Sequence, residues 1–198
     1  MSRRLRVAAA TAVVAGLGIA AAWAPPSGAG AAAASATLVD INGREVGEAR
    51  FRHGPDSTLV ARVTVDIDQA VTANPGEFHG LHLHVGSDAG CVTYAPGSEP
   101  PLAARFSEVG PHWSAPGQAH GSHLGDLPSL ARRADGSAEV EIVLDKATVA
   151  DLVGRALVVH HLADDFGKHP GVGTSATAGN AGARYACGVV ERGGAGAA

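Results

Sequence analysis

The chain has little of three things that mark common protein classes: long amphipathic helices, cysteine and positive charge. Across its 198 residues no long helical pattern is convincing, and the stretch 146–153 supports at most a short turn of helix. There are only two cysteines, Cys91 and Cys187. Because no cysteine precedes Cys91, a lipid anchor on an N-terminal cysteine is excluded. The sequence therefore fits neither a helical bundle nor a lipoprotein of that kind.

Positive charge is scarce enough to exclude one class of partner. Acidic residues outnumber basic ones by 19 to 15, and the formal net charge at pH 7 is −4. Residues 1–36 contain three arginines and no acid, so the remainder has 12 basic and 19 acidic residues and a charge of −7. Nucleic-acid binding depends on clustered lysine and arginine, so we expect no nucleic-acid partner. An anionic substrate would need a locally positive site.

Residues 1–36 have the pattern of a secretory signal peptide. Three arginines lie within the first six residues, an apolar run covers 7–23, and Ala-x-Ala patterns follow at 22–24 and 34–36. The alternative, a permanent membrane anchor, is weaker because the run is mostly Ala, Gly and Thr rather than Leu or Ile. We predict a secreted or extracytoplasmic protein that keeps no stable membrane span after residues 1–36 are removed.

The two cysteines allow one pairing. In an oxidising compartment an isolated pair indicates a disulfide, here between Cys91 and Cys187. It would close a loop of about a hundred residues, to which the loop-entropy model assigns roughly 4–5 kcal/mol. The alternative, a pair of thiolate metal ligands, is less favoured because the chain has enough histidines to supply metal ligands.

Short segments with alternating apolar and polar residues recur between turn signals. In the clearest of them, 59–67, five apolar residues occupy one parity and mostly polar residues the other. The pair Asn42-Gly43 lies between two such segments and predicts a hairpin turn. The segments predicted as strands are 37–41, 45–51, 59–67, 138–144, 156–160 and 184–190. The pattern predicts an all-β fold, a sandwich or barrel.

Three linking stretches are long: 87–110, 112–130 and 163–183. Loops of that size in a compact domain are usually functional or disordered, and function is preferred here because these loops carry the unusual residues. We predict one domain over residues 37–192 with long functional loops, followed by a flexible Gly/Ala tail over 193–198.

The most informative residues are six histidines and one aspartate that fall in three places along the chain. They are His82, His84, His112, His120, His123, Asp126 and His160. Imidazole nitrogen is a favoured ligand of zinc and copper, and carboxylate completes zinc sites. The spacings suit a pair of neighbouring metal ions, so the sequence predicts a two-metal site.

The parity of one segment separates ligands from core residues. His82 and His84 are two apart on a predicted strand, so both point to the same face. Leu81, Leu83 and Val85 point to the other face and are expected in the core. Two metal ligands would therefore project from a rigid strand, on the side away from the packing.

Four further histidines have simpler interpretations. His79 shares the parity of the leucines, so we predict a buried, hydrogen-bonding residue that supports the ligands. His161 follows His160 and points to the opposite face, which places it at the surface. His53 and His169 are assigned to solvent.

Together these motifs resemble the copper/zinc superoxide dismutase family, from about Phe78 to Val190. The specific pieces are His79-Gly-Leu-His82-Leu-His84, Gly110-Pro-His112, His123-Leu-Gly-Asp126, Val158-Val-His160 and Gly179-Asn-Ala-Gly-Ala-Arg184-Tyr-Ala-Cys187. Each piece alone is a weak signal, and their occurrence in this order carries the resemblance. It implies a Greek-key β-sandwich or flattened β-barrel, acting as a monomer or a homodimer.

The resemblance implies a role for each of these residues. Copper would be bound by His82, His84, His112 and His160, and zinc by His112, His120, His123 and Asp126. Asp164 would link a copper histidine to a zinc histidine through hydrogen bonds. Arg184 would be catalytic together with His112, as the anchor for the superoxide anion beside the copper. Cys91 would pair with Cys187 and tie a long loop to the barrel.

The implied activity is the disproportionation of superoxide to dioxygen and hydrogen peroxide. Copper would cycle between two oxidation states, zinc would not, and His112 would act as the bridging imidazolate. The alternative is a secreted copper- and zinc-binding dismutase-like protein without turnover.

Overall fold

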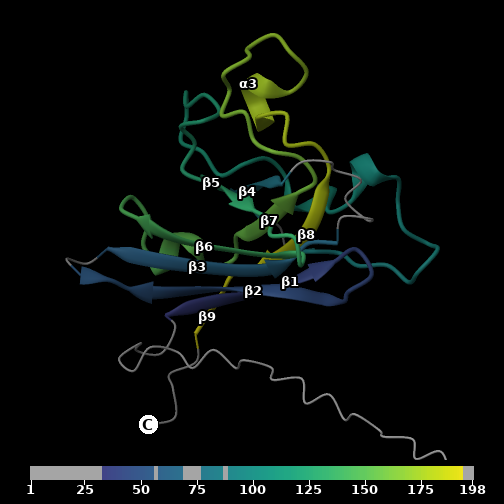
Figure 1. Ribbon diagram of the computed structural model, residues 1–198. Coiled ribbons are helices and arrows are strands. Elements are labelled where there is room, and N and C mark those ends of the chain that lie inside the picture. Colours follow the sequence, from purple (N-terminus) through teal and green to yellow (C-terminus); the bar gives the residue numbers. More distant parts are fainter. Residues whose placement is uncertain (1–32, 56–57, 69–76, 87–88, 194–198) are drawn as a thin grey trace, which may run out of the picture.

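The computed structural model describes residues 33–55, 58–68, 77–86 and 89–193, and within them nine strands form one antiparallel sheet (Figure 1). The strands are β1 (Ala34–Asp40), β2 (Glu45–His53), β3 (Leu59–Asp66), β4 (Phe78–His84), β5 (Asp126–Ala131), β6 (Ser137–Leu144), β7 (Ala156–His160), β8 (Arg184–Val189) and β9 (Glu191–Arg192). Their order is β5-β4-β7-β8-β1-β2-β3-β6, and β9 pairs with β1. Neighbours such as β3 and β6 are far apart in sequence, which gives Greek-key connections.

The sheet curls until its two ends, β5 and β6, meet at a seam. A single bridge joins Arg132 to Ala138, and the amide of Arg133 donates to the carbonyl of Ser137 at 2.8 Å. Beyond this point the two strands are not paired in the described residues. The result is a nearly closed, flattened barrel, which confirms the predicted all-β fold.

The alternation predicted for β3 is confirmed by burial. Ala61 and Val63 are fully buried inside the barrel, whereas Arg62, between them, is partly exposed and forms an ion pair with Glu139 of β6. Successive residues of a strand point to opposite faces, so this alternation places the apolar set in one shared core. Phe51 of β2 is fully buried in the same core.

The hairpin predicted at Asn42-Gly43 is confirmed. Gly43 has a φ of +79°, which suits glycine, and its amide donates to the carbonyl of Asp40 at 2.9 Å. The first strand begins before the predicted segment 37–41, because β1 starts at Ala34, whose side chain is buried in the core. Residues 1–32 of the predicted signal peptide and 194–198 of the predicted tail lie outside the described residues.

Two strands were not predicted, the two-residue β9 and the longer β5. β5 occupies the end of the stretch 112–130 that was predicted as loop. Pro128 interrupts its apolar pattern, and Leu127 and Leu130 are its two buried side chains. Proline is tolerated on an edge strand because no neighbour needs its missing N–H, and β5 stands at one end of the sheet.

The helices are short: η2 (Leu102–Ala104), η3 (Ser107–Val109), α2 (Val149–Leu152) and α3 (Ser175–Ala178). α2 is the predicted short turn, and Thr148 and Asp151 cap its start by exchanging side-chain and backbone hydrogen bonds. Among the described residues, no helix has the length and apolar character needed to cross a bilayer.

The long loops gather over one side of the barrel, above β4, β7 and β8, with α3 at their tip (Figure 1). A disulfide between Cys91 and Cys187 fastens the first of these loops to β8, with the two Cα atoms 5.6 Å apart. The predicted pairing is therefore confirmed, and it links residues separated by 96 positions in the chain.

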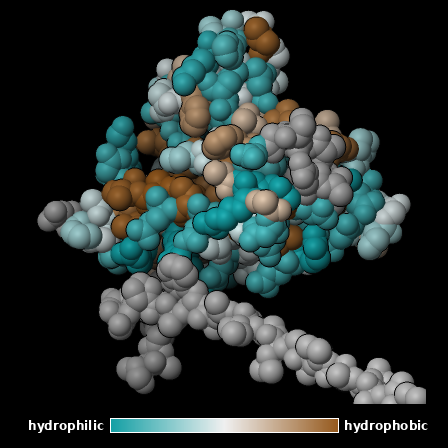
Figure 2. Space-filling model, viewed as in Figure 1, coloured by the Kyte–Doolittle hydropathy of each residue, from teal (hydrophilic) through white to brown (hydrophobic). Residues whose placement is uncertain are grey.

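A groove of about 290 Å³ opens at the seam between β5 and β6. Leu127 and Ile142 are among its apolar lining residues, and His123 and Asp126 also line it. In the space-filling view, apolar side chains gather where the ends of β5 and β6 lie (Figure 2). The seam therefore brings part of the histidine-rich region close to the surface.

Candidate metal centre

The two histidines of β4 lie on the outer face of the barrel but are not exposed. Leu81 and Leu83 point into the core as predicted, and His82 and His84 are only 0% and 1% exposed. The loops above β4 cover them, so the outer face of this strand becomes a second interior. The core position predicted for Val85 is wrong: the strand ends at His84, and Val85 beyond it is 41% exposed.

His112 is placed opposite His84 by its own backbone. The amide of Val85 donates to the carbonyl of Pro111 at 3.0 Å, and the amide of Trp113 donates to the carbonyl of Leu83 at 2.8 Å. These bonds extend β4 by one bridge, between His84 and His112. Trp113 is then buried at the end of the core, with the guanidinium of Arg155 4.1 Å above its ring.

His82, His84, His112 and His160 form a first cluster, whose candidate ligand atoms all lie within 4.8 Å of one another. His84 Nδ1 donates to the carbonyl of Gly110 at 2.8 Å, and His160 Nδ1 donates to the carbonyl of Gly182 at 3.0 Å. Each of these rings therefore leaves Nε2 as a free acceptor.

Three nitrogens of this cluster are buried without a hydrogen-bond partner among the described residues: His82 Nδ1, His84 Nε2 and His160 Nε2. Buried polar atoms in native proteins are almost always paired, so three together need an explanation. A metal ion bound by the imidazole lone pairs would satisfy all three.

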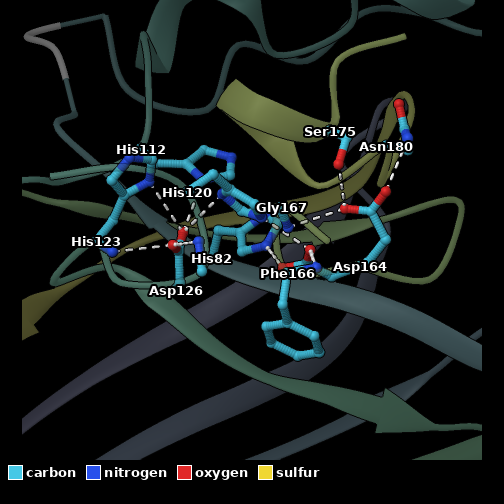
Figure 3. Close-up of polar contacts among 12 residues, drawn as sticks. His82, His112, His120, His123, Asp126, Asp164, Phe166, Gly167, Ser175 and Asn180 are labelled. Atoms are coloured by element: carbon cyan, nitrogen blue, oxygen red, sulfur yellow. Dashed lines mark hydrogen bonds and ion pairs between the residues drawn. The ribbon is translucent and has the colours of Figure 1, made fainter. Parts of the chain in front are cut away.

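A second cluster contains His112, His120, His123 and Asp126 (Figure 3). Asp126 Oδ1 lies 3.0 Å from His112 Nδ1, 3.2 Å from His120 Nδ1 and 3.2 Å from His123 Nδ1. Its other oxygen accepts hydrogen bonds from the amides of Gly121 and His123, at 2.7 and 3.0 Å. Three imidazoles and one carboxylate form a donor set that zinc accepts.

The two clusters share His112. Its Nδ1 faces Asp126, which leaves Nε2 for the first cluster. The rings of His82 and His112 are close, with centroids 4.0 Å apart. One imidazole can therefore serve two metal ions, as the family resemblance implies.

Asp164 connects the clusters a second time. Its Oδ2 lies 2.7 Å from His82 Nε2 and its Oδ1 lies 2.8 Å from His120 Nε2, with all three side chains buried (Figure 3). A carboxylate on the far nitrogen fixes the ring orientation of a ligand histidine. Gly179 gives this carboxylate room: its φ is +59°, and a Cβ atom there would overlap Asp164 Oδ1 and His120 Nε2.

The protonation states suit metal binding. Burial holds the pKa values of His84 and His160 well below the ordinary 6.5. Burial also lowers the pKa of His112, although Asp126 acts in the opposite direction. For Asp126 itself burial would raise the pKa, but the hydrogen bond to His112 and the neighbouring donors outweigh it, and the pKa falls. Neutral imidazoles and an ionised carboxylate are the forms that bind metal.

Arg184 lies beside the first cluster, paired with His160 across β7 and β8. Its Nη1 and Nη2 donate to the carbonyls of Phe106 and Gly110, each at 2.9 Å. The carbonyl of Gly110 also accepts from His84, so the arginine and a cluster histidine share one anchor. The sequence did not predict these backbone acceptors, because every residue has a carbonyl whatever its side chain.

The other histidines divide as follows. His79 is buried and its Nδ1 donates to the carbonyl of His160 at 3.0 Å, as expected of a supporting residue. The surface position predicted for His161 is wrong, since this residue is 3% exposed and its ring lies edge-on to Tyr185. The pairing of β7 with β8 shifts between Val159 and His160, so simple alternation ends there.

The sequence of the chain matches the family model described as copper/zinc superoxide dismutase (SODC) over residues 45–190. The chain belongs to the copper/zinc superoxide dismutase family. Copper and zinc are the metals of this family, and the two clusters could hold one ion of each.

Known relatives agree with this assignment. A Cu-Zn superoxide dismutase of Mycobacterium tuberculosis is 32% identical over 174 residues, covering 80% of this chain and 70% of the relative. One from Mycolicibacterium paratuberculosis is 34% identical over 167 residues, covering 77% and 71%. Among solved structures, a double mutant of a SOD-like protein from Bacillus subtilis is similar, with a TM-score of 0.60 and 25% identity. That match covers 78% of this chain and 95% of the other.

Proposed function

We propose that this chain is an active superoxide dismutase, which converts two superoxide anions and two protons into dioxygen and hydrogen peroxide. One observation supports it most: three unpaired, buried imidazole nitrogens converge with His112 beside a fixed arginine. A purely structural β-sandwich gains nothing from such an arrangement, which costs stability unless a ligand fills it.

The donor sets fit the two metals of the family. Copper would be held by His82, His84, His112 and His160, and zinc by His112, His120, His123 and Asp126. When bound, copper supplies the one-electron chemistry because it changes oxidation state, whereas zinc keeps one state.

The residues of the chain do the rest. Arg184 is permanently charged, and two of its five N–H donors are used by the carbonyls that orient it. It can therefore bind a small anion in a fixed place next to the first cluster. His112 keeps Nδ1 toward Asp126, so a proton needed by the product can be taken up and passed on at Nε2.

The decisive experiment measures metal content and superoxide disproportionation on purified, copper- and zinc-loaded protein. We expect one copper and one zinc per chain. His84→Gln and His160→Gln should lower the rate by about a thousandfold or more, because each removes a copper ligand. His53→Gln, on an exposed residue of β2, is the matched control and should keep full activity. Full activity without bound copper would refute the proposal.

The same measurements test the dismutase-like protein without turnover. That alternative predicts stoichiometric metal and no rate above that of free buffer. An electron paramagnetic resonance spectrum of the copper that changes when zinc is removed would support the shared role of His112.

We also propose that the protein acts outside the cytoplasm, as the pattern of residues 1–36 suggests. The Cys91–Cys187 disulfide supports export, since disulfides persist mainly in oxidising compartments. Fractionation of expressing cells and N-terminal sequencing of the product check this: a product that stays cytoplasmic with residues 1–36 intact would contradict it.

A further inference from the structure

Arg184 is held by both ends of a short arch, residues 106–110. The carbonyl of Phe106 accepts from Nη1 at one end, and the carbonyl of Gly110 accepts from Nη2 at the other. Phe106 is fully buried in the left-handed region, with a φ of +53°, and η3 begins directly after it. Both acceptors are neutral, so these contacts orient the guanidinium without cancelling its charge.

Glu108 lies in the middle of this arch. Its Oε1 accepts a long hydrogen bond from the Ser107 hydroxyl, at 3.5 Å. Its Oε2 is buried and has no hydrogen-bond partner among the described residues. An unpaired carboxylate oxygen in a buried position is unfavourable, and the fold of the arch does not account for it.

The charge of Glu108 acts on Arg184 without pairing with it. Burial lowers the pKa of Arg184, and the negative charge of Glu108 acts in the opposite direction. No ion pair joins the two side chains in the described part of the chain, and the two hydrogen bonds to carbonyls leave the guanidinium with N–H donors for another partner. A nearby carboxylate reduces the positive potential that an incoming anion meets at the arginine.

We propose that Glu108 sets the anion affinity of Arg184: it is a specificity-determining residue that weakens the binding of small monoanions at this anchor. The proposal rests on the proposed function in so far as the natural monoanion is superoxide. Weak binding suits a site that must release its anion in every cycle, and it would lessen blockage by other small anions.

Azide titration of the full copper- and zinc-loaded chain, followed by absorption, tests this without turnover. Glu108→Gln keeps the size of the side chain and an acceptor for Ser107. It should bind azide about threefold to tenfold more tightly at low salt, with a smaller gain at high salt. Glu191→Gln changes the net charge equally, in the exposed strand β9 across the barrel, and should leave azide affinity unchanged.

A second variant distinguishes the effect of the charge from a purely structural effect. Glu108→Ala removes both the charge and the contact with Ser107, and it should raise azide affinity by a similar factor. If Glu108 only supports the arch, the azide affinity of both variants would equal that of the natural chain or fall below it. Either result would overturn the proposal.

Failure of the proposed function gives a different result. A loaded protein that binds azide but does not consume superoxide would refute turnover, and tighter binding by Glu108→Gln would still support the present inference. A chain that takes up no copper would overturn both.

Discussion

Strands β3 and β4 follow the same alternation but carry different outer faces. On β3 the outward Arg62 remains partly exposed and pairs with Glu139. On β4 the outward His82 and His84 are buried, because the long loops cover that half of the barrel. We call β4, β7 and β8 the covered half, and β1, β2, β3 and β6 the bare half. The long loops, rather than the strands, bury the outer face of β4. They therefore shield the unpaired imidazole nitrogens on that face from water.

The largest loss of stability should come from a substitution in the core of the bare half. Phe51→Ala removes a fully buried side chain and should cost about 3–5 kcal/mol of unfolding free energy. Metal stoichiometry of the folded fraction should not change, since Phe51 is no part of either cluster. Urea denaturation and elemental analysis check both points. If the folded variant lost its metals, the core of the bare half would also determine metal binding in the covered half, and the comparison of the two halves would be wrong.

A smaller effect is expected in the covered half, and it concerns metal affinity rather than stability. Gly179→Ala places a methyl group against Asp164 and His120, so it should lower zinc affinity about 10–100-fold. Gly171→Ala is the matched control, because Gly171 also has a positive φ, +92°, but has open space around it. Both variants carry the backbone strain, of about 1 kcal/mol. Equal zinc affinity in the two, measured by competition with a chelator, would show that the space at Gly179 is unimportant.

The last effect concerns pH and the metal-free protein. His84 and His160 have pKa values held below 6.5 by burial, so the folded chain keeps them neutral where the unfolded chain protonates them. Stability should therefore be full above pH 6.5 and fall below it, by at most about 1.4 kcal/mol per pH unit for each group. The contribution of Asp126, whose pKa is depressed, is lost only at more acidic pH, below 3.8.

Urea denaturation at several pH values measures this slope. The His84→Gln/His160→Gln double variant should have a shallower slope between pH 6.5 and 5, since it lacks both titrating groups. An unchanged slope would assign the acid sensitivity to other residues.

The bare half follows closely from local sequence patterns, because each of its strands has one face in the core and one in water. Residues 61–66 of β3 are an example, because apolar and polar residues alternate there and the burial alternates with them. The sequence also predicted the residues that the structure brings together in the two clusters, since several imidazole side chains at such close spacing are unusual. What was missed depends on context: β5 contains Pro128, and His161 follows an irregularity in strand pairing. Neither the strand β5 nor the burial of His161 can be predicted from the few residues around it.

The backbone bonds that fix His112 also fix its neighbour, Trp113, under the guanidinium of Arg155. The chain has two tryptophans, and the other, Trp23, lies in the predicted signal peptide. The mature protein would then have a single indole, one residue away from the imidazole shared by both clusters. Because paramagnetic copper quenches nearby fluorophores, the intrinsic emission of this one residue would report copper occupancy in real time, with no label attached.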